Sequence, residues 1–439
     1  MQSKAGPRMM VNAASLAAAT IITSALGIVF WSLAARLFSP AEVGLANAQL
    51  SGATLIAAFA SLNLASMLLL YLPRAGKRSR WLLTRTYTVT ISLSLLVVFV
   101  IVLIGTADKY LPDALSVGFF VCAVPLMAIF AQQDSALLAM GAGPVVAVEN
   151  AAFAVGKILL LPVFAMLGVA SGIFAAWVIP VGLAVFGVTG YIWRKLITDH
   201  SELPDTIEIP ARRLLWPQLA KLYSSFVAGQ LTNLAIPLVV VGVLGTTQGG
   251  YFTMAWLVGV SFSALITNVT QAFAQDVRRG HEITRATLKR LATLLGLIAI
   301  VGGTVTVIAA PLILKIMAPG YAPFSTTLLR CIGLAVPLQA TWIVMAMFLW
   351  LENRVGWMAL GNVTMATIAI STTYFLAPHV GITAAGLGLI AGEGTLTLIS
   401  IYPLFARVRH IRAGFGADWA GRDHEPPRFN TRERLTNTD

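Results

Sequence analysis

Charge and cysteine are scarce in this sequence. Asp, Glu, Lys and Arg make up 11% of the 439 residues, whereas a soluble domain carries about 25%. The two cysteines, Cys122 and Cys331, fall inside apolar runs, so neither a disulfide framework nor a Cys/His zinc site is expected. A glycine-rich phosphate loop of the P-loop type is also absent, which excludes ATP hydrolysis as the driving reaction. With no sizeable polar domain to hold a catalytic centre, we expect neither an enzyme nor a bound cofactor or metal.

Long apolar runs dominate what is present. Hydrophobic residues form 57% of the chain, and runs of about 20 such residues are long enough to cross a bilayer. The first run continues well beyond Met10 without a convincing cleavage site, so it is interpreted as a membrane helix and not as a signal peptide. We expect an all-α integral membrane protein with twelve spans, at residues 10–35, 43–72, 85–105, 113–139, 145–168, 172–193, 217–243, 249–275, 289–311, 324–350, 355–376 and 383–405.

The basic residues orient these spans. A net charge of +12 could indicate nucleic-acid binding, but in membrane proteins Lys and Arg collect in cytoplasmic loops. With both termini inside, 24 of the 30 Lys and Arg residues fall in cytoplasmic segments and only Arg36, Lys109 and Lys315 fall outside. The asymmetry predicts a protein of the cytoplasmic membrane with both termini in the cytoplasm, and no nucleic-acid partner.

The chain repeats itself weakly. The tetrapeptide at 123–126 recurs at 335–338, Asn150 recurs as Asn362 at the same offset of 212, and the motif at 172–176 returns in altered form at 381–385. Gly44 and Gly250 both follow the first outer turn of their half. Six helices return the chain to the same side, so the halves are expected to be parallel repeats. We therefore predict a six-helix bundle at 1–195, a cytoplasmic linker at 196–216, a second bundle at 217–405, and a disordered cytoplasmic tail at 406–439.

Three ionisable residues interrupt the apolar stretch 119–167. These are Asp134, Glu149 and Lys157, and Lys157 is expected about 18 Å into its helix. A charge at the bilayer centre costs at least ~2.5 kcal/mol and usually faces a bundle interior or a water-filled cavity. The stretch therefore predicts a polar cavity between the helices.

Two segments resemble polysaccharide flippases of the O-antigen type. Residues 30–44, FWSLAARLFSPAEVG, are similar to the end of the first helix in those members of the multidrug/oligosaccharidyl-lipid/polysaccharide (MOP) exporter superfamily. Residues 311–330 look like the passage from the ninth to the tenth helix of the same family. The resemblance implies two six-helix bundles arranged in a V around a central cavity. It also implies transfer of a polyprenyl-(pyro)phosphate-linked saccharide from the inner to the outer leaflet, for cell-surface polysaccharide assembly. Related lipid II flippases usually have fourteen helices, against twelve here.

Such a substrate needs cations for its phosphates and polar partners for its sugars. Lys157 and Asn150 are expected on one helix face, although Lys157 could instead neutralise Asp134 or Glu149. The other substrate-binding candidates are Arg36, Lys221, Gln230, Asn233 and Arg330. For Arg36, Lys221 and Arg330 the alternative is an interfacial side chain that snorkels to the membrane surface. Pro217, Gly229 and Pro237 predict a broken or bent helix around Lys221.

Asp134, Glu149 and Glu393 are candidates for ion coupling. Glu393 stands between two glycines near the middle of the last span, where it is either a hydrogen-bonded structural acid or a proton-coupling site. A cation-coupled multidrug exporter of the same superfamily is the first alternative function, and its cationic substrates would favour an acidic cavity. A membrane glycosyltransferase or ligase is the second, but no acidic pair with metal spacing lies on a loop. Expected partners are the lipid-linked saccharide, membrane lipids and a glycan polymerase or ligase.

Overall fold

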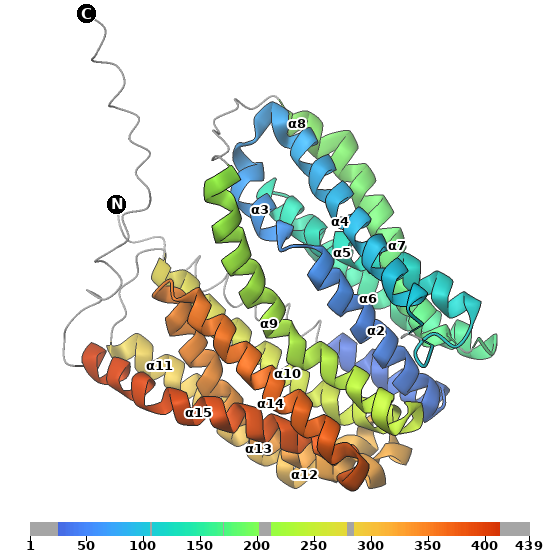
Figure 1. Cartoon of the computed structure of the whole chain (residues 1–439), viewed down its shortest axis with the longest axis vertical. Coiled ribbons are helices and arrows are strands. Elements are labelled where there is room, and N and C mark those ends of the chain that lie inside the picture. Colours follow the sequence, from blue (N-terminus) through green and yellow to red (C-terminus); the bar gives the residue numbers. More distant parts are fainter. Residues whose placement is uncertain (1–24, 106–107, 170, 202–211, 279–284, 413–439) are drawn as a thin grey trace, which may run out of the picture.

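The computed structural model describes residues 25–105, 108–169, 171–201, 212–278 and 285–412, and within these ranges all the regular structure is helical (Figure 1). Eleven of the described helices, or runs of consecutive helices, are long and apolar enough to cross a membrane. A shorter apolar helix, Ala25–Leu37, precedes them and covers the end of the first predicted span, whose earlier residues lie outside the described part. The eleven later predicted spans each have a counterpart.

The helix Ala25–Leu37 is followed in the N-terminal half by α2 (Pro40–Ala60), α3 (Leu64–Tyr71), η1 (Leu72–Arg74), η2 (Gly76–Arg78), α4 (Ser79–Leu103), α5 (Ala114–Ala139), α6 (Gly143–Met166), α7 (Gly172–Tyr191), η3 (Ile192–Leu196) and α8 (Ile197–Ser201). The C-terminal half contains α9 (Arg212–Leu244), α10 (Thr246–Arg278), α11 (Arg285–Gly296), η4 (Leu297–Val301), α12 (Gly302–Met317), η5 (Pro319–Tyr321), α13 (Ala322–Leu351), α14 (Val355–Val380) and α15 (Thr383–Arg412).

Short polar side chains set where two of the N-terminal helices begin. The Ser39 hydroxyl accepts a hydrogen bond from the Glu42 backbone N–H, and the Glu42 carboxylate accepts one in return from the Ser39 N–H at 2.8 Å. This reciprocal pair satisfies two N–H groups that the first turn of α2 would otherwise leave free. Asp113 does the same for α5, where its carboxylate accepts from the Ser116 N–H at 2.6 Å.

The two halves repeat the same neighbour pattern. In the N-terminal half α5 packs against α2, α4 and α7, and α7 packs against α6. In the C-terminal half α13 packs against α10, α12 and α15, and α15 packs against α14. The helices α5 and α7 therefore have the neighbours of their counterparts α13 and α15, as parallel repeats require. The predicted domain boundaries stay a prediction, since much of the linker lies outside the described residues.

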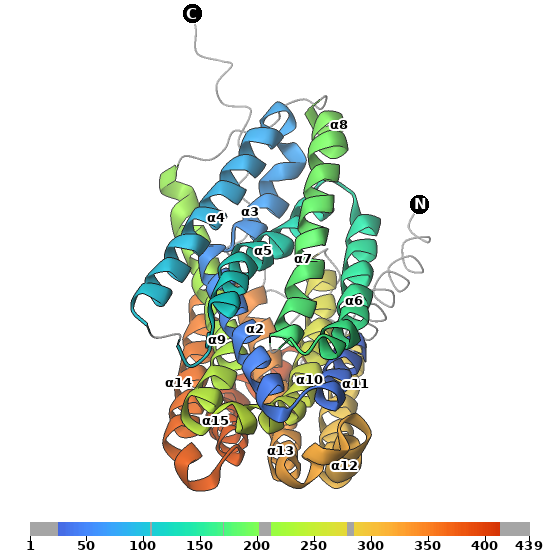
Figure 2. The ribbon, with the colours of Figure 1, turned by 90° about the vertical axis from the view of Figure 1, so that its right-hand side faces the viewer.

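The halves meet through α2, α9 and α10 at one end and diverge toward the other (Figures 1 and 2). The closed end carries the loops predicted to lie outside the membrane. Here α2 and α10 approach backbone to backbone at the repeated glycines. A Cβ on Gly44 would lie 2.0 Å from the Thr246 carbonyl oxygen, and one on Gly250 would lie 2.0 Å from that of Pro40. Only residues without a side chain permit this contact.

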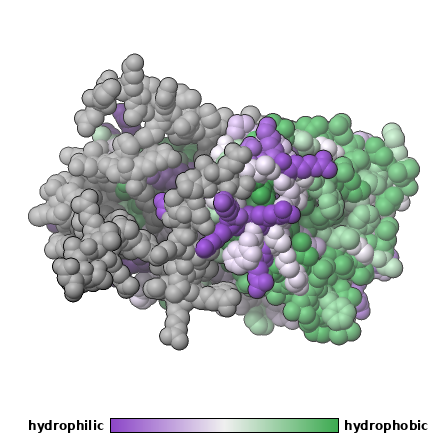
Figure 3. Space-filling view, turned by 90° about the horizontal axis from the view of Figure 1, so that it is seen from above, coloured by the Kyte–Doolittle hydropathy of each residue, from purple (hydrophilic) through white to green (hydrophobic). Residues whose placement is uncertain are grey.

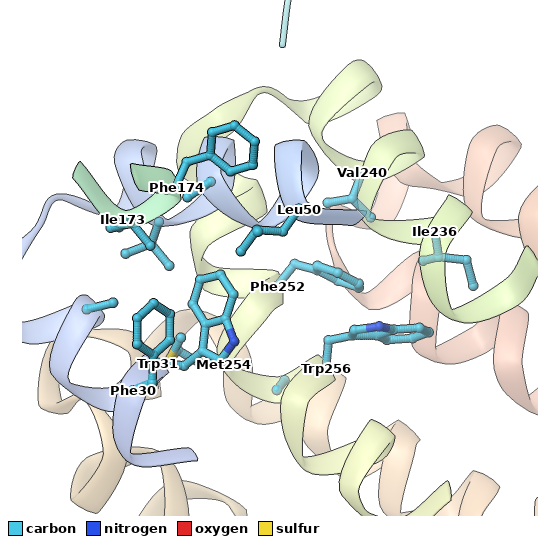
Figure 4. Close-up of a cluster of buried hydrophobic side chains, with 14 of the residues drawn as sticks. Phe30, Trp31, Leu50, Ile173, Phe174, Ile236, Val240, Phe252, Met254 and Trp256 are labelled. Carbon is cyan, nitrogen blue, oxygen red and sulfur yellow. The ribbon is translucent and has the colours of Figure 1, made fainter. Parts of the chain in front are cut away.

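Apolar side chains from both halves fill the closed end. The helix Ala25–Leu37 and α7 contribute Phe30 and Phe174, α2 contributes Leu50, and α10 contributes Phe252 and other residues (Figure 4). All four of these side chains are buried. The shared core makes this end one packed unit, whereas no comparable cluster of described residues joins the halves at the other end.

The diverging end is basic. Contacts between η2 and α8 bring two loops together that are about 120 residues apart in the sequence. Hydrophilic side chains gather on this end beside an apolar flank (Figure 3). The exposed basic residues of the two loops are Arg74, Lys77, Arg78, Arg80, Arg194 and Lys195. Their clustering fits the charge asymmetry from which the cytoplasmic side was predicted.

One predicted span is broken where no break was expected, and a helix predicted to be broken or bent is continuous. The span predicted at 43–72 is broken between α2 and α3, where Leu62 and Asn63 have φ of 46° and 53°. The left-handed region is uncommon for residues other than glycine, and no sequence signal of glycine or proline marked the break. Conversely, α9 runs unbroken from Arg212 to Leu244 despite Pro217 and Pro237. The predicted tail begins within α15, which extends to Arg412, and the rest of the tail lies outside the described residues.

Candidate functional site: an aromatic box around Lys157

Lys157 lies in the interior of the N-terminal half. It is 14 residues from the start of α6, hence about 21 Å along the helix. Only 5% of its surface is exposed. Lys157 is therefore buried among helices, and its position near the middle of the membrane stays a prediction. A primary ammonium at this depth needs partners that replace its water.

Three aromatic rings supply those partners. The Lys157 ammonium nitrogen lies 3.8 Å from the ring centroid of Trp177, 4.7 Å from that of Phe153 and 5.2 Å from that of Phe30. We call these three rings the aromatic box. They come from α7, α6 and the helix Ala25–Leu37, so three segments of the bundle converge on one cation. A desolvated ammonium over a ring face gains about 2 kcal/mol.

The rings also hold one another in place. Phe30 meets Trp177 edge to face at 5.2 Å between centroids, and Phe153 does so at 5.5 Å. Edge-to-face contacts are the favoured arrangement for aromatic pairs. The rings of the aromatic box therefore pack against one another as well as against the lysine.

No carboxylate of the described residues forms a salt bridge with Lys157. The predicted alternative, a salt bridge to Asp134 or Glu149, is not found among the described residues. The salt bridges that do occur there join Glu352 to Arg407 and Arg354. The cation is thus stabilised by rings that leave its charge uncompensated, so an anion could still pair with it.

Asn150 belongs to a separate polar group. Its side-chain amide donates to the Asp134 carboxylate at 3.4 Å and to the Val146 carbonyl at 3.0 Å. Glu149 beside it is 5% exposed, and neither of its carboxylate oxygens has a hydrogen-bond partner among the described residues. Helix geometry placed Asn150 on the face of Lys157, but its hydrogen bonds join it to Asp134 on α5.

A second enclosed site lies in the C-terminal half. Glu393 on α15 is 1% exposed, and its Oε1 accepts a hydrogen bond from the Gln339 amide at 3.4 Å. Its Oε2 has no partner in the described part of the chain, and neither has the indole N–H of Trp256. Both residues line a cavity of about 20 Å³, together with Asn233 and Gln339, which is room for about one water molecule. The structure thus brings the predicted residues Asn233 and Glu393 to one cavity.

The remaining predicted residues lie apart from both sites. Arg36 reaches across to the other half, where its guanidinium donates to the Ile316 carbonyl at 2.6 Å and to that of Met317 at 3.3 Å. Arg330 is exposed on the face of α13 that also exposes Leu334, which is where a snorkelling side chain would lie. Gln230 is half-buried on α9. Lys221 is on the same helix, but its side chain is outside the described part.

Sequence reasoning missed Trp177, Trp256 and Gln339. Trp177 directly follows the repeated motif 172–176, yet its meeting with Lys157 depends on how α6 and α7 pack. Phe153 is the one residue of the aromatic box that the sequence could have linked to Lys157, because it lies four residues earlier and therefore on the same helix face.

Known proteins resemble this one in structure but not in sequence. No family model and no curated protein matches this sequence. Solved structures do match over most of the chain. The fold is that of the MATE transporters. An inward-facing multidrug resistance MATE family transporter of the MOP superfamily matches with a TM-score of 0.66 at 13% identity, over 89% of this chain and 95% of that one.

The MATE-like fold is matched in other conformations as well. An outward-facing MATE transporter of the MOP superfamily gives a TM-score of 0.57 at 13% identity, covering 90% of this chain and 96% of that one. A MATE in complex with MaL6 gives 0.57 at 13% identity, with 90% and 97% covered. The present arrangement is thus more similar to the inward-facing form. The matched proteins are transporters of the MATE family.

Proposed function

We propose that this protein is an alternating-access transporter that flips a polyprenyl-(pyro)phosphate-linked saccharide from the inner to the outer leaflet of the cytoplasmic membrane. The MATE-like fold, closed at one end and diverging at the other, supports alternating access. The observation that carries the substrate class is Lys157, a buried cation that no acid in the described part of the chain neutralises. The rings of the aromatic box carry no net charge, so an anionic headgroup would be the counter-ion of Lys157.

The same argument assigns roles to the other polar groups. Glu393 and its cavity, and the pair Asp134 and Glu149, are proposed as ion-coupling sites, since each includes a buried carboxylate oxygen that an ion or proton could satisfy. Arg36 is proposed to close the outer end in the inward-facing state. A glycan polymerase or ligase would take the flipped substrate on the outer side.

A matched pair of substitutions at Lys157 tests the proposal. Lys157→Arg keeps a cation on a long stem, whereas Lys157→Met keeps the stem and removes the charge. Purified variants would be reconstituted into liposomes with a fluorescent polyprenyl-pyrophosphate saccharide, and flipping would be followed by an impermeant quencher. We expect part of the wild-type rate for Arg and less than about a tenth of it for Met, a loss of at least about 1.4 kcal/mol. Reconstituted amounts should be equal.

An active Lys157→Met protein would remove Lys157 from the substrate path and with it the basis for an anionic substrate. A second function, cation-coupled multidrug export, is favoured by the MATE neighbours and by the buried acids Glu149 and Glu393, each of which has a carboxylate oxygen without a hydrogen-bond partner among the described residues. The same liposomes loaded with a cationic dye distinguish it. Dye transport without saccharide flipping would establish the exporter.

A further inference from the structure

A groove lies on the exposed face of α11, apart from the aromatic box and from the cavity beside Glu393. Its volume is about 440 Å³, and it lies at the end of the C-terminal half where α11 begins. Two cations, one hydroxyl and two leucines share it. The lining residues are Ala286, Lys289, Arg290, Thr293, Leu294 and Leu297.

The opposite face of α11 fixes the groove in place. Leu288, Leu291 and Leu295 are buried, and they belong to a core cluster that includes Ile266 of α10 and Val336 of α13. Leucines at these helical spacings anchor the backbone while Lys289 and Arg290 project from the exposed side. The two cations therefore start from a rigid helix, so less entropy is lost when they bind a ligand together.

An exposed apolar stripe continues from the groove toward the other end of α12. It recurs every three to four residues, as one face of a helix facing lipid does. Its members are Leu294, Leu297, Val301, Val305, Ile308, Leu312 and Ile316. Lys289 and Arg290 lie about one helical turn before Leu294, the first residue of the stripe. We expect this turn at the boundary between the hydrocarbon core and the headgroups.

We propose that this groove binds one anionic phospholipid of the cytoplasmic leaflet. Arg290 can present two parallel N–H donors to a phosphate, Lys289 adds a point charge, and the Thr293 hydroxyl is a further donor. Leu294 and Leu297 take the first part of an acyl chain. Neither Lys289 nor Arg290 forms a salt bridge with a described residue, so both side chains are available to bind the phosphate of the lipid. Lys and Arg side chains near the cytoplasmic membrane surface attract acidic headgroups.

Native mass spectrometry of the purified protein with phosphatidylglycerol or phosphatidylcholine tests the site. The wild type should retain one more phosphatidylglycerol than phosphatidylcholine under the same conditions. In the double variant Lys289→Gln/Arg290→Gln the affinity of that extra lipid should fall about tenfold or more. Inorganic phosphate at millimolar concentration should not displace it, because a free ion lacks the acyl chain that Leu294 and Leu297 would hold.

The matched control is Lys109→Gln/Lys315→Gln, which lowers the net charge by the same amount but removes two lysines at the opposite end of the bundle. It should leave the retained phosphatidylglycerol unchanged. Equal loss in both double variants would show that only net charge attracts the lipid, and no loss in Lys289→Gln/Arg290→Gln would show that these side chains merely snorkel. Either result overturns the proposal. Elution volume and thermal unfolding of each variant confirm that the fold is intact.

Discussion

Three ionisable side chains, two of them buried and one half-buried, are held in three different ways. Lys157 lies on aromatic rings, Glu393 accepts one amide hydrogen bond beside a small cavity, and Glu352 pairs with Arg407 through two contacts of 2.5 and 2.8 Å. Only the last is a neutralised pair. The first two therefore keep ionisable groups without a counter-charge among the described residues, which can respond to a ligand or an ion at the expense of stability.

The variant Glu393→Gln tests whether Glu393 couples transport to an ion gradient or only stabilises the fold. The amide keeps the shape and an acceptor for Gln339 but removes a desolvated carboxylate, so thermal stability should be unchanged or slightly higher. Flipping in liposomes should lose its response to an imposed proton or sodium gradient. The control Glu352→Gln breaks the pair with Arg407 and should lower stability by about 1 kcal/mol. If Glu393→Gln lowered stability instead and kept the gradient response, Glu393 would be a structural acid.

At the scale of elements, the contact of α2 with α10 is the tightest point between the halves. Gly44 and Gly250 allow backbone contact there, and Arg36 fastens the preceding helix to the end of α12. Further contacts come from the loop before α5, where the Tyr110 hydroxyl donates to the Leu238 carbonyl of α9 at 2.8 Å. These groups must separate if the protein is to open at this end.

Gly44→Val should prevent closure. Its Cβ would lie 2.0 Å from the Thr246 carbonyl oxygen, so α2 and α10 must move apart. Spin labels on Lys109→Cys and Lys315→Cys, with Cys122 and Cys331 replaced by serine, report the distance between the halves at this end. We expect the distance distribution to shift to longer values and saccharide flipping to fall at least about tenfold.

Gly187→Val is the control for added bulk, because a Cβ at Gly187 meets nothing within 4 Å. It should leave the distance distribution as in the wild type. An unchanged distribution in Gly44→Val, with normal flipping, would show that the glycine contact does not limit closure.

For the whole molecule, charge and fold together predict the orientation. The basic loops of the N-terminal half meet at the diverging end, whereas Lys109 and Pro378 line one groove at the closed end. The closed end therefore gathers segments that the charge asymmetry assigns to the outside. An inward-facing state follows from that assignment.

Reporter fusions check the orientation. Fusions at Lys77, Arg212 and Arg279 should report the cytoplasm, and fusions at Lys109, Thr247 and His379 should report the outside, because 24 basic residues lie on one side and 3 on the other. Alkaline phosphatase and green fluorescent protein give opposite signals on the two sides. A cytoplasmic signal at Thr247 would contradict two parallel halves.

The sequence by itself determined where the eleven later spans lie and that the chain repeats itself. Those features depend on local length and hydropathy, since each span must satisfy its backbone hydrogen bonds within itself in lipid. Polar residues inside the spans, such as Lys157 and Glu393, were visible for the same reason. Their partners were not. Lys157 meets Phe30 across 127 positions and Glu393 meets Gln339 across 54, and only the packing of helices decides which faces meet. The break between α2 and α3 and the role of Arg36 likewise arise from tertiary contacts that no local pattern encodes.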